Sequence, residues 1–324
     1  MRAVVLREFG PPARLVAEEV PDPVAGPGQV VITAAAAGIT FIETMTRAGR
    51  TLGPRPLPEL PVVLGNGVGG VVTALGPGAD PALVGARVVS VTGGTGGYAE
   101  QVAVDAAEPI RVPDPLPLPE AVALLADGRT ALALAERAAP AAGEWVLVEA
   151  AGGGVGSLLV QLAVAAGARV IGAASGERKL GLARERGAAA TVDYSHPGWP
   201  ARVREITGGA GVGLVFDGVG GGIGQAAFGL VADGGTFCVM GAASGSITQP
   251  PADAVEQRKV EVIGLWSVQR TPAQLRELSI AALAEAAAGR LLPTIGQTFP
   301  LCRAADAHAA IEARATLGKT LLIA

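Results

Sequence analysis

The chain has 324 residues, of which 50% are hydrophobic but only 3% aromatic, and 47 are glycine. This length favours two domains, and many small apolar residues suit an α/β protein in which helices pack closely on a sheet. The formal net charge is −4, with 17% charged residues. We therefore expect no nucleic-acid partner, because the chain offers no basic field to bind one.

Cysteine usage and the apolar segments bear on the cellular setting. Cys238 and Cys302 lie far apart and offer neither a disulfide framework nor a four-cysteine zinc lobe. The first apolar run, Ala3–Leu6, is shorter than the core of a secretory signal. Windows 23–42 and 60–79 approach the ~20 residues of a membrane span, but glycine, proline and polar residues interrupt both. We expect a cytoplasmic protein with no membrane partner.

Residues 1–118 are predicted to form a strand-rich domain. Short β-like runs alternate with glycine and proline: Ala3–Leu6, Gln29–Ala37, Val68–Leu75, Arg87–Val91 and Tyr98–Val104. Prolines at 113, 115, 117 and 119 then form a stiff stretch, after which helical periodicity begins. A domain boundary is predicted near residue 118.

Strands and helices alternate through residues 119–289, which predicts a Rossmann-type, doubly wound sheet of six parallel strands. Gly167 and Gly187 stand where helices should end. The predicted strands are Trp145–Glu149, Arg169–Gly172, Thr191–Val192, Leu214–Phe216, Thr236–Met240 and Val260–Leu265. The predicted helices are Val155–Ala166, Glu177–Arg186, Pro200–Thr207 and Gly224–Leu230. The tail, 290–324, is expected to return to the first domain with a strand, a helix over Arg303–Ala315 and a strand over Thr320–Ile323.

A glycine turn follows the first strand of the predicted Rossmann sheet. Backbone N–H groups at the start of the next helix, with the positive end of its dipole, would bind a pyrophosphate. Read as G-x-G-x-x-G, the motif has alanine in its first position, so a turn made only for tight packing is the alternative. The candidate cofactor-binding residues here are Ala151, Gly152, Gly153, Gly154, Val155 and Gly156.

The end of the second predicted strand favours NADPH over NADH. An NAD enzyme would usually have an acid there, whereas this chain has Ala173-Ala174-Ser175. Ser175, Arg178 and Lys179 offer a hydroxyl and two cations for a 2′-phosphate, although the two cations also fit a solvated helix face. Tyr194, after the third strand, is either a contact for the adenosine or a structural residue.

Five motifs in order along the chain carry a family resemblance. They are Ala36–Thr44 with Arg47-Ala48-Gly49, Gly96–Glu100, Gly128–Ala131, Ala150–Gly156, and Ala307-His308 with Gly318-Lys319. The chain resembles the zinc-independent quinone oxidoreductases, the zeta-crystallin-like group of the medium-chain dehydrogenase/reductase superfamily. The resemblance implies a GroES-like catalytic domain, residues 1–118 with 290–324, and a Rossmann domain, residues 119–289, with nicotinamide and substrate between them. It also implies a homodimer or homotetramer, often joined through the strand near Val260–Leu265.

The resemblance also bears on metal. Zinc alcohol dehydrogenases of the superfamily would have cysteine where Thr40 stands and Gly-His-Glu where this chain has Gly65-Asn66-Gly67. Both ligand positions are changed, and the whole chain has two histidines and two cysteines. We therefore expect no metal at the site.

Without zinc, hydride from NADPH is best accepted by a carbon that is already polarised, in a quinone, an enone or an enoyl thioester. Thr40 and Thr130 are predicted to lie near the developing enolate oxygen and the nicotinamide, unless they bond only their own backbone. Many members have Asn in place of Thr40 and a Tyr in the turn where this chain has Arg50-Thr51-Leu52. Arg50 either takes that tyrosine's place or faces solvent.

Later strand ends supply the remaining candidates. Gly241 and Ser267 are expected on the cofactor side, Trp266 either walls the cleft or packs in the core, and His308 is favoured as structural. The leading prediction is an NADPH-dependent reductase of a quinone or α,β-unsaturated carbonyl compound. The alternative is a cofactor-binding member with altered, non-redox chemistry, isomerase-like or cyclase-like, or with a nucleotide-sensing role.

Overall fold

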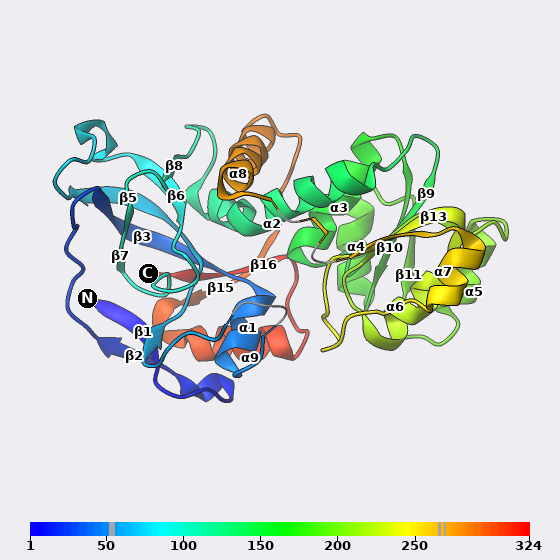
Figure 1. Cartoon of the computed structure of the whole chain (residues 1–324), viewed down its shortest axis with the longest axis horizontal. Coiled ribbons are helices and arrows are strands. Elements are labelled where there is room, and N and C mark those ends of the chain that lie inside the picture. Colours follow the sequence, from blue (N-terminus) through cyan, green and yellow to red (C-terminus); the bar gives the residue numbers. More distant parts are fainter. Residues whose placement is uncertain (52–55, 265–266, 269) are drawn as a thin grey trace. The chain divides into compact units, whose positions relative to one another are not determined.

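The computed structural model describes residues 1–51, 56–264, 267–268 and 270–324 (Figure 1). The chain divides into two compact units, Met1–Ala126 with Ser279–Ala324, and Asp127–Leu278. These limits fall inside two helices, α2 (Leu118–Ala138) and α8 (Pro272–Ala287). The limits predicted from the sequence, near residues 118 and 289, instead lie at the start of α2 and just after α8. Within the described ranges, no helix is both long and apolar enough to cross a membrane.

The first unit is built on two sheets. The larger has the strand order β15-β16-β3-β5-β6-β8, with β7 also paired with β3. The smaller has the order β2-β1-β4. The strands are β1 (Arg2–Leu6), β2 (Leu15–Glu19), β3 (Gln29–Ile39), β4 (Val62–Val63), β5 (Gly67–Leu75), β6 (Arg87–Val91), β7 (Gln101–Asp105), β8 (Ile110–Arg111), β15 (Ile295–Pro300) and β16 (Lys319–Ile323). The helices are η1 (Pro12–Arg14), α1 (Phe41–Arg47), η2 (Pro81–Leu83), η3 (Leu301–Arg303) and α9 (Ala304–Glu312).

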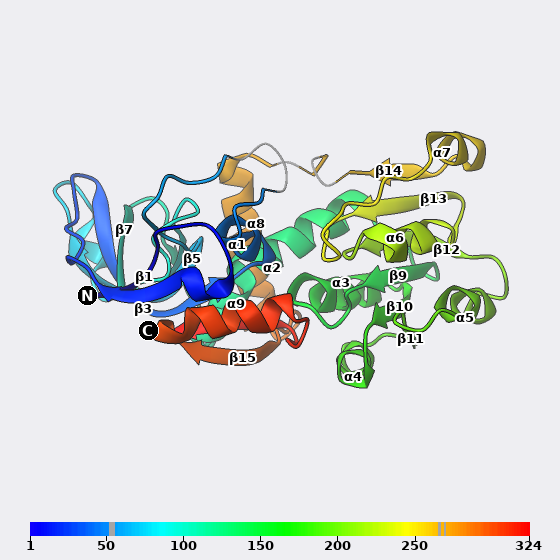
Figure 2. The same ribbon diagram turned by 90° about the horizontal axis from the view of Figure 1, so that it is seen from below.

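The tail of the chain completes the larger sheet, as predicted. β16 pairs antiparallel with the end of β3, so that Thr320 lies opposite Ile39. β15 pairs in parallel with β16 and lies beside α9 (Figure 2). Strand β3 is buried along most of its length, because it has neighbours in the sheet on both sides and packs into the core. This pairing brings Lys319 to the strand end that precedes α1.

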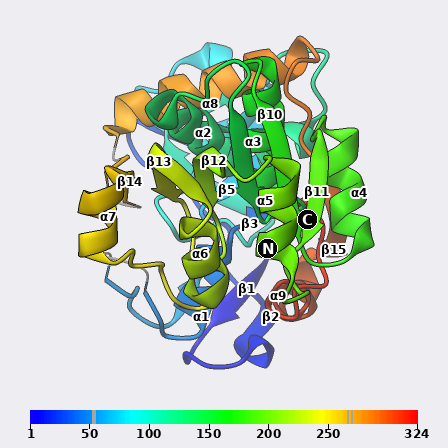
Figure 3. The ribbon, with the colours of Figure 1, turned by 90° about the vertical axis from the view of Figure 1, so that its right-hand side faces the viewer.

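The second unit is the predicted doubly wound sheet. Its six parallel strands have the order β11-β10-β9-β12-β13-β14, with the first strand inside the sheet. They are β9 (Trp145–Glu149), β10 (Arg169–Ala174), β11 (Ala190–Asp193), β12 (Val212–Asp217), β13 (Val231–Val239) and β14 (Glu261–Ile263). Figure 3 shows β14 and β11 on opposite sides of this unit. The helices of this unit include α3 (Gly154–Ala165), α4 (Glu177–Glu185), α5 (Trp199–Ile206), α6 (Gly221–Phe228) and α7 (Ala252–Arg258).

The differences from the predicted elements have physical reasons. Helix ends move by one to three residues, as frayed ends commonly do. Helices α1, α7 and α8 are not among the predicted helices. In α7 none of the residues is buried, so its sequence carries no apolar period. Gly167 and Gly187 follow the helix C-caps with left-handed φ of 84° and 99°, as expected. The predicted strand through Leu265 ends at Ile263 in the structure, and Leu265 and Trp266 lie outside the described residues.

Candidate active site

A glycine turn joins β9 to α3, in the arrangement that the sequence predicts. It runs from Ala150 to Gly156, with Gly153 as the N-cap and Gly154 as the first helical residue. The first N–H groups of a helix have no acceptor within it, and the helix dipole adds a partial positive charge there. Gly153, Gly154 and Val155 are only partly buried. This end of α3 is therefore suited to an anion such as a pyrophosphate.

Packing within the unit also requires glycine in this turn. A Cβ at Gly152 would lie 2.5 Å from the Cβ of Lys179, and a Cβ at Gly154 would lie 2.0 Å from Oδ2 of Asp127. Real side chains do not approach so closely. Two neighbours of the turn are thereby identified: Lys179, and a carboxylate, Asp127, that the sequence analysis did not single out.

Two alanines set the backbone of the turn. Ala150 has a left-handed φ of 49°, which costs a non-glycine residue ~1–2 kcal/mol. Its carbonyl oxygen would lie 2.2 Å from a Cβ at Gly156, so the helix start fits only a glycine there. Ala151, the first position of the imperfect motif, is fully buried and donates its N–H to the carbonyl of Ala173 at 3.1 Å. The turn is thus held against β10.

The predicted 2′-phosphate residues follow β10 directly. Arg178 is exposed on the first turn of α4, and its guanidinium has no ion pair or hydrogen bond within the described part of the chain. On the same helix, Arg184 is bound to Glu177 and donates to Oγ1 of Thr191 at 2.9 Å. Arg178 is therefore available to a ligand, whereas Arg184 is engaged within its own unit.

An acid that the sequence analysis missed lies at the same strand ends. Asp193, the last residue of β11, accepts the N–H of Gly176 at 2.9 Å and the N–H of Ser195 at 2.8 Å. Partial burial opposes its charge, but the hydrogen bonds from Ser195 and Gly176 hold the pKa of Asp193 below its usual value. Tyr194 donates its N–H to Ala174 at 3.2 Å, and its side chain packs against the core of this unit.

The two later candidates differ in their surroundings. Gly241 follows β13 and donates its N–H to the carbonyl of Asp217 at 3.2 Å, so it lies at the carboxyl edge of the sheet. Ser267 lies in an exposed turn, where its hydroxyl donates to the carbonyl of Gly264 at 2.7 Å. The hydroxyl of Ser267 is thus engaged by its own turn.

A pair of buried carboxyl groups lies at the ends of β9 and β12. Glu149 accepts the N–H of Val219 at 3.2 Å, and Asp217 accepts the N–H of Gly220 at 2.7 Å. Both residues are fully buried. Burial, and then the charge and hydrogen bond of Asp217, raise the pKa of Glu149 well above its usual value. We take Glu149 as protonated at neutral pH, because two adjacent buried carboxylates cannot both be ionised.

In the first unit, one carboxylate connects two candidate positions. Glu43 Oε2 accepts the N–H of Thr40 at 2.5 Å and its hydroxyl at 3.1 Å, and Oε1 accepts the N–H of Asn66 at 2.7 Å. Glu43 and Lys319 are each 4% exposed. The pKa of Glu43 is raised above its usual value, because the effect of burial outweighs the N–H of Thr40, the charge of Lys319 and the N–H of Asn66, which lower the pKa. The spacing Thr40-x-x-Glu43, a capping box, is the sequence signal that could have revealed this contact.

A pair of buried polar rings, Tyr98 and His308, lies near Glu43. The Tyr98 hydroxyl is 3.1 Å from Nε2 of His308, and both residues are fully buried. Burial and then the nearby Arg47 lower the pKa of His308 to about 3, so its ring is neutral. Burial, the charge of Glu43 and a hydrogen bond with Glu43 raise the pKa of Tyr98 well above its usual value. This buried geometry suits the structural role favoured for His308.

The other two catalytic candidates lie in different units. Arg50 follows α1 in the first unit; its N–H bonds the carbonyl of Met45 at 2.9 Å, and its exposed guanidinium has no partner among the described residues. Thr130 lies on the part of α2 that belongs to the second unit and is partly buried. The structure brings Thr40, Glu43 and Asn66 together within the first unit. Thr130 belongs to the second unit.

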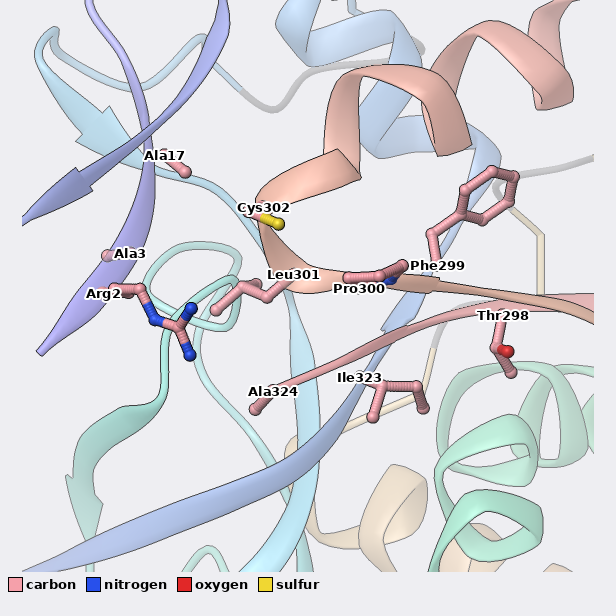
Figure 4. Close-up of a pocket in the computed structure, with 10 residues that line it drawn as sticks. All are labelled: Arg2, Ala3, Ala17, Thr298, Phe299, Pro300, Leu301, Cys302, Ile323 and Ala324. Carbon is pink, nitrogen blue, oxygen red and sulfur yellow. The ribbon is translucent and has the colours of Figure 1, made fainter.

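A cavity of about 320 Å³ opens elsewhere on the first unit (Figure 4). Arg2, Phe299, Cys302 and the final residue, Ala324, are among those that line it. The guanidinium of Arg2 is bound to Glu100, with a 2.7 Å ion pair. The cavity contains none of the candidate site residues, so it adds nothing to the site.

The residues in place of the zinc ligands make other contacts. Thr40 and the N–H of Asn66 are bonded to Glu43. Over the described ranges, no group of three or more His, Cys, Asp or Glu residues is placed to hold a metal ion.

Comparison with known proteins places the chain in a family. Residues 26–114 match the alcohol dehydrogenase GroES-like domain, and residues 154–285 match the zinc-binding dehydrogenase domain. A 2-haloacrylate reductase from Burkholderia is 34% identical, over 99% of this chain and 98% of that protein. A quinone oxidoreductase from Pseudomonas aeruginosa is 33% identical, over 92% of each chain. The structure of Escherichia coli quinone oxidoreductase complexed with NADPH has a TM-score of 0.90, with 29% identity over 100% of both chains.

These matches extend over nearly the whole length of the chain and of its relatives. The chain belongs to the quinone oxidoreductase, zeta-crystallin-like group of the medium-chain dehydrogenase/reductase superfamily. The family prediction and the fold class, a Rossmann-type sheet with a strand-rich GroES-like unit, are thus confirmed.

Proposed function

We propose that the protein is an NADPH-dependent reductase of a quinone or of an α,β-unsaturated carbonyl compound. The observation that carries this proposal is the accessible N-terminus of α3, placed after a glycine turn at the carboxyl edge of a doubly wound sheet. The names of the relatives support the same reaction class, since a haloacrylate is an α,β-unsaturated acid and a quinone is a cyclic α,β-unsaturated diketone.

The residues of the second unit fit NADPH. The turn 151–156 would hold the pyrophosphate, and the hydroxyl of Ser175 with the cations Arg178 and Lys179 would hold the 2′-phosphate. We propose Tyr194, Gly241 and Ser267 as further cofactor contacts. NADPH supplies the hydride when bound, and the protein must position a polarised carbon and donate to the oxygen that becomes negative.

We propose Thr40, Arg50 and Thr130 as the residues that contact the substrate. Residues 1–118 with 290–324, which lie within the first unit, would then form the catalytic domain, and residues 119–289 would form the dinucleotide-binding domain. Glu43 supports a zinc-independent site, because it binds the two positions that would otherwise carry ligands. Elemental analysis of the purified, active protein is expected to find no stoichiometric zinc.

We also propose a cytoplasmic homodimer or homotetramer. The edge strand β14 supports this, because its Val262 is 37% exposed and an uncovered apolar edge strand favours pairing with another chain.

The test of the cofactor site is a binding measurement. The double variant Arg178→Ala, Lys179→Ala removes both predicted phosphate contacts, and each charge-assisted bond contributes ~1.5–3 kcal/mol. We expect the Kd for NADPH to rise at least ~10- to 150-fold while the Kd for NADH changes little. Arg202→Ala, on the distant helix α5 with an i,i+3 ion pair to Glu205, is the matched control. An unchanged Kd for NADPH in the double variant would refute the assignment.

A further inference from the structure

The turn at Asn66 is fixed on every side except that of its side chain. The N–H of Asn66 donates to Glu43 at 2.7 Å, and its carbonyl accepts the N–H of Thr92 at 3.1 Å. Gly65 has φ of 105°, and a Cβ at Gly67 would lie 2.8 Å from Cδ2 of Leu125. The backbone of the turn is therefore held in one shape. In Gly65-Asn66-Gly67, Asn66 is the residue that has a side chain.

The carboxamide of Asn66 is left unengaged in this frame. Asn66 is partly exposed, and its side chain makes no hydrogen bond with the described part of the chain. The same carboxylate that holds its backbone also holds Thr40, so the two residues lie beside each other. The amide is uncharged and has two N–H donors, so it can donate to a carbonyl oxygen, whereas a carboxylate can only accept.

The hydroxyl of Thr40 cannot easily do the same work. A threonine hydroxyl has one proton, and here it donates to Oε2 of Glu43 at 3.1 Å. Because Glu43 already takes that proton, the hydroxyl of Thr40 offers only lone pairs to a bound molecule. A developing enolate oxygen needs a donor instead.

We propose that Asn66 is a further catalytic residue, whose carboxamide donates to the carbonyl oxygen of the substrate, and that Glu43 is the residue that positions it next to Thr40. The inference rests on the proposed reduction. During hydride transfer to the β-carbon, the carbonyl electrons move to oxygen, where the N–H of Asn66 stabilises the negative charge. A proton from solvent then completes the α-carbon, so electrons and protons balance.

The first test removes the donor and keeps the frame. Asn66→Leu has similar size and retains the backbone N–H to Glu43, so we expect an unchanged Kd for NADPH and a kcat for an accepted enone about 100-fold lower. Asn66→Gln, which keeps an amide, should recover part of that loss. A kcat for Asn66→Leu equal to that of the wild type would overturn the proposal.

The second test asks whether Glu43 acts through Asn66. Glu43→Gln puts an amide among N–H donors, so we expect a lower kcat, by about 10- to 100-fold, with the Kd for NADPH unchanged. If Glu43 acts through Asn66, the double variant with Asn66→Leu should be little worse than the worse single variant. Fully multiplicative losses would mean that Glu43 does not act through Asn66.

A binding test remains informative even without turnover. p-Nitrophenolate resembles an enolate oxygen on a planar ring, and its absorbance reports binding to the NADP⁺ complex. We expect Asn66→Leu to weaken this binding about 10- to 100-fold. Equal affinity in wild type and variant would contradict the role of Asn66, whereas wild-type protein that binds both ligands but oxidises no NADPH would contradict only the proposed function.

Discussion

Among the described residues, each unit buries one glutamate, and the partners of the two glutamates differ. In the first unit, Glu43 accepts hydrogen bonds from Thr40 and Asn66 and faces the cation of Lys319. In the second unit, Glu149 faces another carboxyl group, Asp217, which raises its pKa further. Burial raises the pKa of both glutamates, but the partners of Glu43 oppose this shift, whereas the carboxyl group of Asp217 adds to it for Glu149. Burial alone therefore does not tell what a buried acid does; its partners do.

The largest effect is expected from removing the cation beside Glu43. Lys319→Met leaves a buried carboxylate without its counter-ion, which typically costs about 3–5 kcal/mol of the free energy of unfolding. Urea unfolding of the wild type and the variant would measure it. The double variant Glu43→Gln, Lys319→Met should recover much of the loss, because no charge is then left unpaired. A loss below about 1 kcal/mol in Lys319→Met would mean that Glu43 is not an anion.

Acid should weaken the first unit through His308. Its pKa in the folded protein is about 3, against an ordinary value of 6.5. The unfolded chain therefore takes up a proton below pH 6.5 that the folded chain cannot, and stability falls by up to about 1.4 kcal/mol per pH unit. Relative to His308→Gln, which can still donate to Tyr98, the wild type should lose about 2 kcal/mol by pH 5. A difference in unfolding free energy that stays constant from pH 7.5 to 5 would contradict this.

Alkali should instead weaken the second unit through Glu149. A raised pKa means that its contribution to stability is full below the ordinary glutamate pKa and is lost as the pH rises towards the folded value. Glu149→Gln can still donate to Asp217 and accept from Val219, without that loss. We expect this variant to be more stable than the wild type at pH 8, on the order of 1 kcal/mol, and to lose its advantage near pH 4. A variant less stable at pH 8 would break the comparison.

The same two regions show how far the sequence carries the interpretation. The turn Ala150–Gly156 is contiguous, so its place between strand and helix followed from the residue pattern. The hydrogen bond from Asn66 to Glu43 and the charge of Lys319 that acts on Glu43 come from residues 23 and 276 positions away along the chain. No local pattern predicts such pairing, because it depends on how β16 pairs with β3. The capping box at Thr40 is visible in the sequence, but it predicts only the contact of Glu43 with Thr40 and not the one with Asn66.

The strand ends of the second unit give a similar lesson. Dinucleotide-binding folds usually carry an acid after the second strand, and its absence after β10 favours NADPH. Asp193, after the next strand, holds Gly176 by a 2.9 Å hydrogen bond that only the parallel pairing of β10 and β11 brings about. Sequence position alone could not assign that contact.

The most direct test of the proposed reduction follows the hydride itself. The protein would be given NADPH deuterated at C4 of the nicotinamide, together with an α,β-unsaturated ketone that it accepts, and the reduced product examined by mass spectrometry and NMR. The proposed reaction predicts one deuterium per product molecule, on the β-carbon, with the α-carbon proton drawn from solvent. Product without deuterium, or an enone isomerised or cyclised while NADPH stays intact, would contradict the proposed reduction and favour non-redox chemistry on the same fold.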